Sequence, residues 1–189
     1  MKCRQLQSCR AMRFLLLIPA SAILLAAAGP ELFDAARNNQ VAILKPYLES
    51  KGDPNARDEG GHTLLILAAY NGQKDAVDLL LKYGADVNSQ DRMGTPLMAA
   101  CFKGDKAIVD RLLKAGARVN DRNGIGATAL MFAALTARFE VVQVLRKHSA
   151  DVDVVDERGL TARKLAEQQG NDEMVKVLEN HRTAGRAAR

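Results

Sequence analysis

The chain has 189 residues, of which 48% are hydrophobic and 26% charged, and it carries a formal net charge of +5. The length allows one ordinary domain. The composition indicates a folded chain, with disorder expected only at its two ends. Aromatic residues make up only 4% and Trp is absent, so the core must be built from Ala, Leu and Val. Such small residues favour closely packed helices.

Residues 1–28 differ in kind from the rest of the chain. They contain four basic residues and no acid, run apolar from Phe14 to Ala28, and end in small residues. This pattern predicts a secretory signal peptide cut after Ala28, or a few residues earlier, because a membrane span needs about 20 apolar residues. An uncleaved signal anchor is the alternative. A lipoprotein is disfavoured, because Cys3 and Cys9 precede the apolar run.

The positive charge of the chain lies mostly in this segment. Four of the 27 basic residues and none of the 22 acidic residues fall there, which leaves 23 basic against 22 acidic residues and a charge of +1. Residues 182–189 are predicted to be a flexible basic tail, because three arginines stand there among small residues. No basic stripe extends this tail, so nucleic-acid binding is disfavoured.

Cys101 is the only cysteine after residue 28, so no disulfide can form within the rest of the chain. A lone thiol in an exported protein could pair between chains or react. Packing is the favoured interpretation, because Cys101 follows Ala99 and Ala100 in a segment with a helical pattern.

A repeat with a period of 32 or 33 residues runs through the chain. One column is formed by Thr63, Thr95, Thr128 and Thr161, and a second by Leu48, Leu80, Leu112, Leu145 and Leu178. Two independent columns with one period indicate a stack of supersecondary units, none of which can bury its apolar side alone.

Each unit predicts two helices joined by turns. The threonine is expected at the N-cap of the first helix, and in one unit Pro96 follows at the first helical position. A leucine and two alanines then form a short helix that ends at a glycine such as Gly104, although Ala137 stands there in one unit. Valine and leucine at helical spacing predict the second helix. An outward turn before the next threonine is favoured by Asp58, Asp91 and Asp156, each with a glycine close behind.

The run DRMGTPLMAACFKGD at residues 91–105, followed by IVDRLLKAGARVN at residues 108–120, resembles the ankyrin repeat almost residue for residue. The resemblance covers about residues 30–180. It implies an all-α ankyrin-repeat solenoid of about five helix-turn-helix units with short outward turns. The domain is expected at residues 29–181, with units at roughly 29–57, 58–90, 91–122, 123–155 and 156–181.

The first and last units depart from the repeat in ways that suit caps. No outward turn precedes Pro30 and Leu32, which otherwise match the start of the second unit. In the last unit, Arg163, Lys164 and Glu167 replace apolar residues. Terminal repeats need a polar outer face, because no neighbour covers them.

Other departures lie within the units. Pro46 falls inside the second helix of the first unit and is expected to kink or interrupt it. The turn before Thr95 is one residue short. The histidine typical of the family at the fourth position of its first-helix motif is replaced by Ile66, Met98, Met131 and Lys164. Apolar packing is therefore expected in place of the hydrogen bonds of that histidine.

No residue set in the chain indicates catalysis or a cofactor. The three histidines, His62, His148 and His181, fall in different units, which disfavours a shared metal site. Sequence signatures of nucleophile elbows, phosphate loops and metalloproteases are absent. The chain is therefore predicted to be no enzyme, with no cofactor, metal or catalytic residue.

The resemblance to ankyrin repeats implies that the concave face, built from the turns and the first helices, binds other proteins. The matching positions give these candidates: Tyr70, Asn71, Arg92, Met93, Phe102, Lys103, Ile125, Leu135, Glu157 and Arg158. Tyr70, Phe102 and Leu135 are expected to form a row across three units. Large apolar residues there indicate a binding patch, unless they merely pack on one another.

The sequence thus predicts a non-catalytic protein-interaction module that is periplasmic or secreted. Its expected partner is another exported protein or the outer part of a membrane protein, with no nucleic acid and no membrane after signal cleavage. An inhibitor, immunity or stabilising protein for an exported enzyme would use the same face, and a small-ligand receptor is a weaker alternative. The short signal and simple architecture favour a bacterial source. The oligomeric state stays open.

Overall fold

A computed structural model of the chain describes residues 29–179, which form ten helices and no strand. The first helices of the five units are α2 (Pro30–Arg37), α4 (Leu64–Asn71), α6 (Pro96–Lys103), α8 (Ala129–Leu135) and α10 (Ala162–Gln168). The second helices are α3 (Val41–Glu49), α5 (Lys74–Lys82), α7 (Lys106–Lys114), α9 (Phe139–Lys147) and α11 (Asp172–Glu179). The expected all-α ankyrin-repeat solenoid is confirmed. The predicted signal peptide and the basic tail at 182–189 lie outside the described residues.

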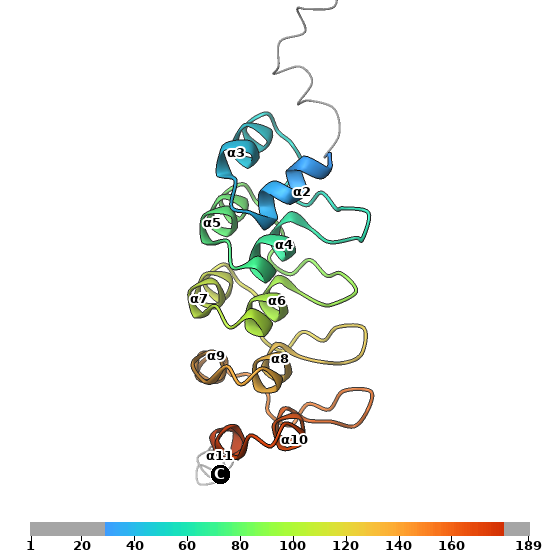
Figure 1. Cartoon of the computed structure of the whole chain (residues 1–189), viewed down its shortest axis with the longest axis vertical. Coiled ribbons are helices and arrows are strands. Elements are labelled where there is room, and N and C mark those ends of the chain that lie inside the picture. The colour runs from blue at the N-terminus through green and yellow to red at the C-terminus, as the bar shows by residue number, and fades with distance from the viewer. Residues whose placement is uncertain (1–28, 180–189) are drawn as a thin grey trace, which may run out of the picture.

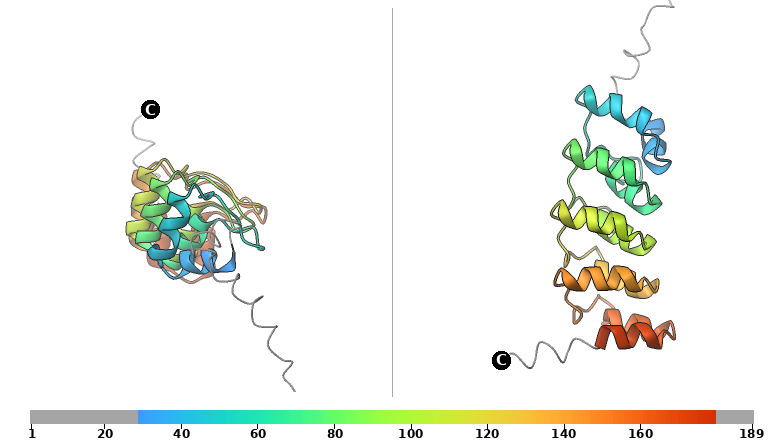
Figure 2. Two further views of the ribbon diagram at one scale, coloured as in Figure 1. Left: turned by 90° about the horizontal axis from the view of Figure 1, so that it is seen from above. Right: turned by 90° about the vertical axis from the view of Figure 1, so that its left-hand side faces the viewer.

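The helix pairs stack along one axis, and the turns between them project to one side (Figure 1). First helices pack against first helices, from α2 to α10, and second helices pack against second helices, from α3 to α9. Seen from above, the turns extend away from both helical layers (Figure 2). The concave face therefore lies where the turns meet the first helices.

The repeated threonines begin the first helices, as expected. Thr63, Thr95 and Thr161 are N-caps whose side-chain oxygens accept the backbone N–H three residues further on. Thr128 occupies the same position in the fourth unit, but its hydroxyl does not cap α8. A capping threonine stabilises a helix by about 1 kcal/mol relative to alanine.

An acidic or amide side chain closes each outward turn by accepting backbone N–H groups within it. The turn residues are Asp58, Asp91, Asn123 and Asp156. In the turn that begins at Asp91, the backbone N–H of Asp91 reaches the carbonyl of Gly94, whereas that of Asp58 reaches His62. The turn before Thr95 is thus one residue shorter, as its sequence indicates.

Asparagines in the links after the second helices join successive units. The side-chain oxygens of Asn55, Asn88 and Asn120 accept the backbone N–H groups of Asp86, Arg118 and Asp151 at 2.7, 2.9 and 2.9 Å. Each bond spans about one repeat, so the same side chain fixes the same spacing three times.

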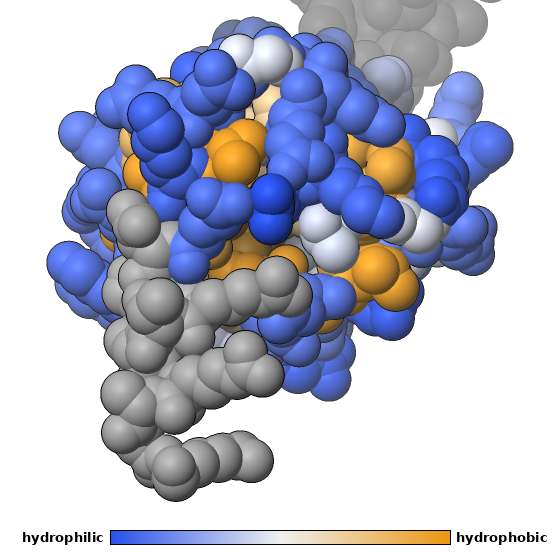
Figure 3. Space-filling model, turned by 90° about the horizontal axis from the view of Figure 1, so that it is seen from below, coloured by the Kyte–Doolittle hydropathy of each residue, from blue (hydrophilic) through white to orange (hydrophobic). Residues whose placement is uncertain are grey.

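The core consists of small and aliphatic residues from both helical layers. Ile66, Met98 and Met131, which replace the histidine of the family, are 5%, 2% and 2% exposed, so apolar packing takes its place in three units. At the fourth of these positions, Lys164 is exposed, and the expectation of apolar packing is wrong there. At the C-terminal end the visible described surface is mainly hydrophilic, as expected of a cap (Figure 3).

Of the two expectations for Pro46, a kink or an interruption of its helix, the interruption is wrong. Helix α3 continues through Pro46 to Glu49. A proline at this position removes the N–H that would bond to the carbonyl of Ala42. Both residues are exposed, so water can reach that carbonyl.

Ala137 adopts the left-handed conformation that glycine takes in neighbouring units. Its φ is 55°, against 77° for Gly72 and 85° for Gly104. This conformation costs an L-residue about 1–2 kcal/mol. Glycine avoids this cost, but its more flexible unfolded state offsets part of the gain in stability. We expect Ala137→Gly to raise the free energy of unfolding by about 0.5 kcal/mol in urea titration.

A matched control for this prediction is Ala115→Gly. Ala115 also ends a helix at an exposed position, but its φ is −79°. Glycine there relieves no strain, so we expect a loss of about 0.5 kcal/mol. Equal losses in both variants would contradict the assignment of strain to Ala137.

Candidate functional site

An apolar groove of about 370 Å³ lies on the concave face, between the first helices and the outward turns of the second and third units. Its lining is mainly apolar and comes from α4, α6, α8 and the turns before Thr63 and Thr95, with Arg37 of α2 at one end. The apolar lining residues are Ile66, Leu67, Tyr70, Met93, Met98, Ala99, Phe102 and Phe132. The groove is thus built by successive repeats and by no single one.

Three aromatic rings form a row in the groove. Tyr70 and Phe102 stack with ring centroids 5.9 Å apart and planes 10° from parallel. Phe132 meets Phe102 edge to face at 6.3 Å. Tyr70 and Phe102 remain 42% and 37% exposed, so they pack on one another and still present a large apolar surface.

The expectation that Leu135 continues this row needs correction. Leu135 is half-buried against the core and does not line the groove. Phe132 from the preceding turn of α8 occupies the place next to Phe102. The residue at its repeat position in the third unit is Ala99. The side chain of Ala99 is much smaller than that of Phe132, so the third unit places no ring at this repeat position.

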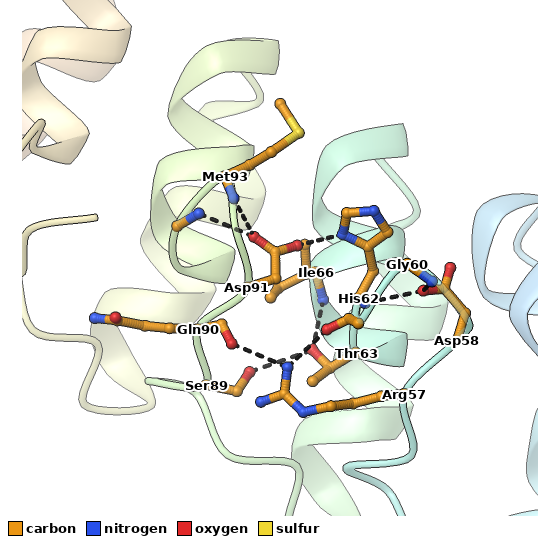
Figure 4. A network of polar contacts seen from close by, with 12 residues as sticks. Arg57, Asp58, Gly60, His62, Thr63, Ile66, Ser89, Gln90, Asp91 and Met93 are labelled. Atoms are coloured by element: carbon orange, nitrogen blue, oxygen red, sulfur yellow. Dashed lines mark hydrogen bonds and ion pairs between the residues drawn. The ribbon is translucent and has the colours of Figure 1, made fainter. Parts of the chain in front are cut away.

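A pair of polar side chains joins two turns at the edge of the groove. Nδ1 of His62 lies 2.5 Å from Oδ2 of Asp91, and the Asp91 side chain is only 1% exposed. The other oxygen of Asp91 accepts the N–H groups of Met93 and Gly94 at 2.7 and 2.9 Å (Figure 4). Asp91 therefore shapes its own turn, positions the exposed Met93 and fastens both to the preceding turn.

Two arginines link successive turns further along the face. A guanidinium nitrogen of Arg57 donates to the carbonyls of Gly61 at 2.7 Å and Gln90 at 2.9 Å (Figure 4). Arg122 similarly donates to Gly126 in its own turn and to Val155 at the next. These hydrogen bonds connect successive turns into a ladder along one side of the groove.

The two remaining links of this ladder involve the turn of the fourth unit. The side-chain amide of Asn123 donates to the carbonyl of Met93 at 3.1 Å. The backbone N–H of Glu157 donates to the carbonyl of Ile125 at 3.0 Å. All four described turns are therefore joined in sequence.

The other candidates from the sequence lie at different places relative to the groove. Asn71 and Met93 line it, and Met93 is 56% exposed. Arg92, Lys103 and Ile125 are exposed but are not part of its lining. Glu157 and Arg158 belong to the turn of the last unit and do not line it either.

Arg158 is tied to the buried carboxylate of its own turn. Its guanidinium donates to Asp156 at 2.8 and 3.0 Å. Burial raises the pKa of Asp156, but the N–H of Leu160 and the backbone and guanidinium donors of Arg158 outweigh it and hold the pKa below its ordinary value. The Arg158 guanidinium therefore stabilises the turn.

The described residues contain no arrangement suited to metal binding or to thiol chemistry. Within residues 29–179, no three His, Cys, Asp or Glu side chains are grouped so that they could hold a metal ion. Cys101 is fully buried, and this burial raises the pKa of its thiol, as expected for a packed cysteine. In the same part of the chain, no helix has the length and apolar character needed to span a membrane.

Sequence reasoning missed the contacts that cross between units. It treated His62 and Asp91 separately, although they lie 29 positions apart and so in neighbouring turns. It also assigned no contact to Arg57 or Arg122. A comparison of repeat columns could have found Phe132, because a large residue there follows a small one, Ala99, in the preceding unit.

Comparison with known families identifies the repeats. A model described as "Ankyrin repeats (3 copies)" matches residues 32–123, and one described as "Ankyrin repeats (many copies)" matches residues 112–166. The two matches overlap and together run from α2 into α10.

Curated relatives from several eukaryotes share this part of the chain. Dauer abnormal formation protein 25 of Caenorhabditis elegans is 32% identical over 80% of the chain and 31% of its own length. Potassium channel AKT2/3 of Arabidopsis thaliana is 29% identical over 72% of the chain and 17% of its own length. Human ankyrin repeat domain-containing protein 29 is 48% identical over 31% of the chain and 20% of its own length. The chain spans less than a third of each of these proteins.

Proposed function

The chain is an ankyrin-repeat protein, and we therefore propose that it binds a partner protein by taking apolar side chains of that partner into the groove on its concave face. Ankyrin repeats in general form protein-interaction modules, and the chain carries the helices and turns of such a module. The proposed activity is binding without catalysis.

The observation that carries this proposal is the group of exposed, large apolar side chains that line the groove. Tyr70 and Phe102 are 42% and 37% exposed while Met93 beside them is 56% exposed, so three large apolar side chains gather at one place. A partner that covers these side chains removes their apolar surface from water. This burial contributes about 25 cal/mol of binding free energy per Å² of apolar surface. Aromatic residues in such places are frequent binding hot spots.

We also propose that binding takes place outside the cytoplasm, in the periplasm or after secretion. The support for this is the pattern of residues 1–28, which the structure does not describe. The partner would then be an exported protein or the outer part of a membrane protein. An inhibitor or stabiliser of an exported enzyme would use the same groove. The bacterial origin favoured by the sequence stays an expectation, since the relatives named above are eukaryotic.

A capture experiment tests the proposal. The chain without residues 1–28 and its Tyr70→Ala/Phe102→Ala variant are immobilised and exposed to the exported fraction of the source organism. Circular dichroism confirms that the variant is folded. We expect a protein that is retained by the wild type and lost from the variant. Retention of the same proteins by both would contradict binding in the groove.

A further inference from the structure

Basic side chains that form no ion pair with any described residue lie beside the groove. From them we infer that the occupant of the groove is an acidic segment of the partner, in which carboxylates flank one or more apolar side chains. This inference rests on the proposed function and specifies the chemistry of the partner. The apolar part would enter the groove, and the carboxylates would meet Lys103 and Arg138 at its edge.

The side chains of Lys103 and Arg138 lie over the C-terminal ends of successive first helices, although they come from different repeat positions, since Arg138 corresponds to Asp105. A methyl group added to Gly72, at the end of α4, would be 3.8 Å from Cε of Lys103 and also 3.8 Å from Oδ2 of Asp105. One added to Gly104, at the end of α6, would be 2.4 Å from Cδ of Arg138. Each basic side chain thus lies over the end of the preceding first helix, next to the residues that carry Tyr70 and Phe102.

Within the part of the chain that the structure describes, neither cation forms an ion pair. Both are exposed, and no carboxylate of residues 29–179 forms an ion pair with either. Arg92, next to Met93 in the turn, is also exposed and forms no ion pair within the same range. Lys103, Arg138 and Arg92 therefore have no direct ion-pair partner among residues 29–179, although the Asp105 carboxylate lies near Lys103.

The acidic side chains near the groove already have partners. Asp58 pairs with Arg37 at 2.7 Å, and Asp91 pairs with His62. Asp105 caps α7 and lies 3.5 Å from the Lys74 ammonium. Glu59, in the preceding turn, is exposed.

Helix stability does not account for Arg138. It is the N-cap residue of α9, where the helix dipole disfavours a cation. The equivalent N-caps of α5 and α7 are Gln73 and Asp105, which are neutral and acidic. Lys103 ends α6, where a cation does suit the dipole. The dipole of α9 thus gives no reason for a positive charge at position 138, whereas an acidic partner would give one.

The size of the groove indicates an extended segment as its occupant. A volume of about 370 Å³ is at the lower end of the range for ligand pockets and suits a few side chains. Aromatic side chains in the groove and cations beside it match a segment that carries both apolar and acidic residues.

The test uses three fluorescein-labelled peptides with the same apolar centre, Leu-Phe-Leu, and with Asp/Glu, Ser/Gln or Lys/Arg flanks. Their affinity for the full chain is measured by fluorescence anisotropy at low and high salt. We expect the acidic peptide to bind about five- to tenfold more tightly than the neutral one, as for two exposed ion pairs. This advantage should shrink at high salt, because salt screens exposed charges.

Two variants identify the groups responsible. Lys103→Asn/Arg138→Gln takes residues that the chain itself uses at these positions in the second unit, Asn71 and Gln73, so the fold should be kept. We expect it to abolish the preference for acidic flanks and to leave the affinity of the neutral peptide unchanged. Tyr70→Ala/Phe102→Ala should weaken binding of both peptides.

Several outcomes would overturn the inference. These are equal or weaker binding of the acidic peptide, a preference that survives Lys103→Asn/Arg138→Gln, and no binding of any peptide up to about 1 mM. Dodecanoate is assayed beside the peptides. If it binds and no peptide does, the occupant is a small amphipathic anion instead. If the neutral peptide binds and the aromatic variant loses it, the proposed function survives while the acidic preference fails, so the two failures can be told apart.

Discussion

Replacing Asp91 by alanine should lower the free energy of unfolding by about 2 kcal/mol, because a buried carboxylate with charged hydrogen bonds would be lost. The side chain is 1% exposed and holds the N–H groups of Met93 and Gly94 as well as the ring of His62. Its removal leaves the turn without its central acceptor. Urea denaturation followed by circular dichroism measures the loss.

Two control variants separate the contributions of Asp91. Asp91→Asn keeps an oxygen for the two turn N–H groups, and Asn123 already serves in this way in the next unit. We therefore expect a loss of about 1 kcal/mol or less for it. His62→Ala removes only the contact to the preceding turn and should fall between the two. If Asp91→Ala costs less than about 0.5 kcal/mol, the pair does not hold the turns together.

The Tyr70→Ala/Phe102→Ala variant should lose about 2 kcal/mol of binding free energy for the partner, which is close to a thirtyfold rise in Kd. Both rings are partly exposed and stack on one another, so their truncation removes the largest apolar surface of the groove. Isothermal titration calorimetry with the captured partner gives the change directly.

The control for this variant is Tyr83→Ala. Tyr83 is a half-buried aromatic residue at the end of α5, in the layer of second helices, and it does not line the groove. Its truncation should reduce stability and leave Kd unchanged. A similar loss of affinity in both variants would show that binding depends on overall stability and that the aromatic row has no special part in it.

The repeat columns predicted the helix pairs, the outward turns and the threonines that begin the first helices, of which three cap their helix through the side chain. These features follow from local chemistry that recurs every 32 or 33 residues, so one column supports the next. The burial of Cys101 and Met98 followed from the same periodicity. The position of the candidate face was predicted from the resemblance to ankyrin repeats, whose binding positions match Tyr70, Phe102 and Met93 in this sequence.

The contacts across that face could not be read from the sequence. Whether Leu135 or Phe132 meets Phe102 depends on how far one helix is rotated against the next, and the repeat period does not specify that rotation. The contact between His62 and Asp91 depends on the paths of two turns of unequal length. Pro46 was misjudged because local propensity was weighed without the solvent exposure of the helix.

Photo-cross-linking from the groove tests the central claim most directly. p-Benzoylphenylalanine is placed at Met93, which is exposed at the groove, and separately at Gln143, which is exposed on α9 in the second layer. Each protein is irradiated with the captured partner, and the adducts are mapped by mass spectrometry. We expect an adduct from position 93 and none from position 143. An adduct from position 143 alone would show that the partner binds the layer of second helices and would contradict recognition in the groove.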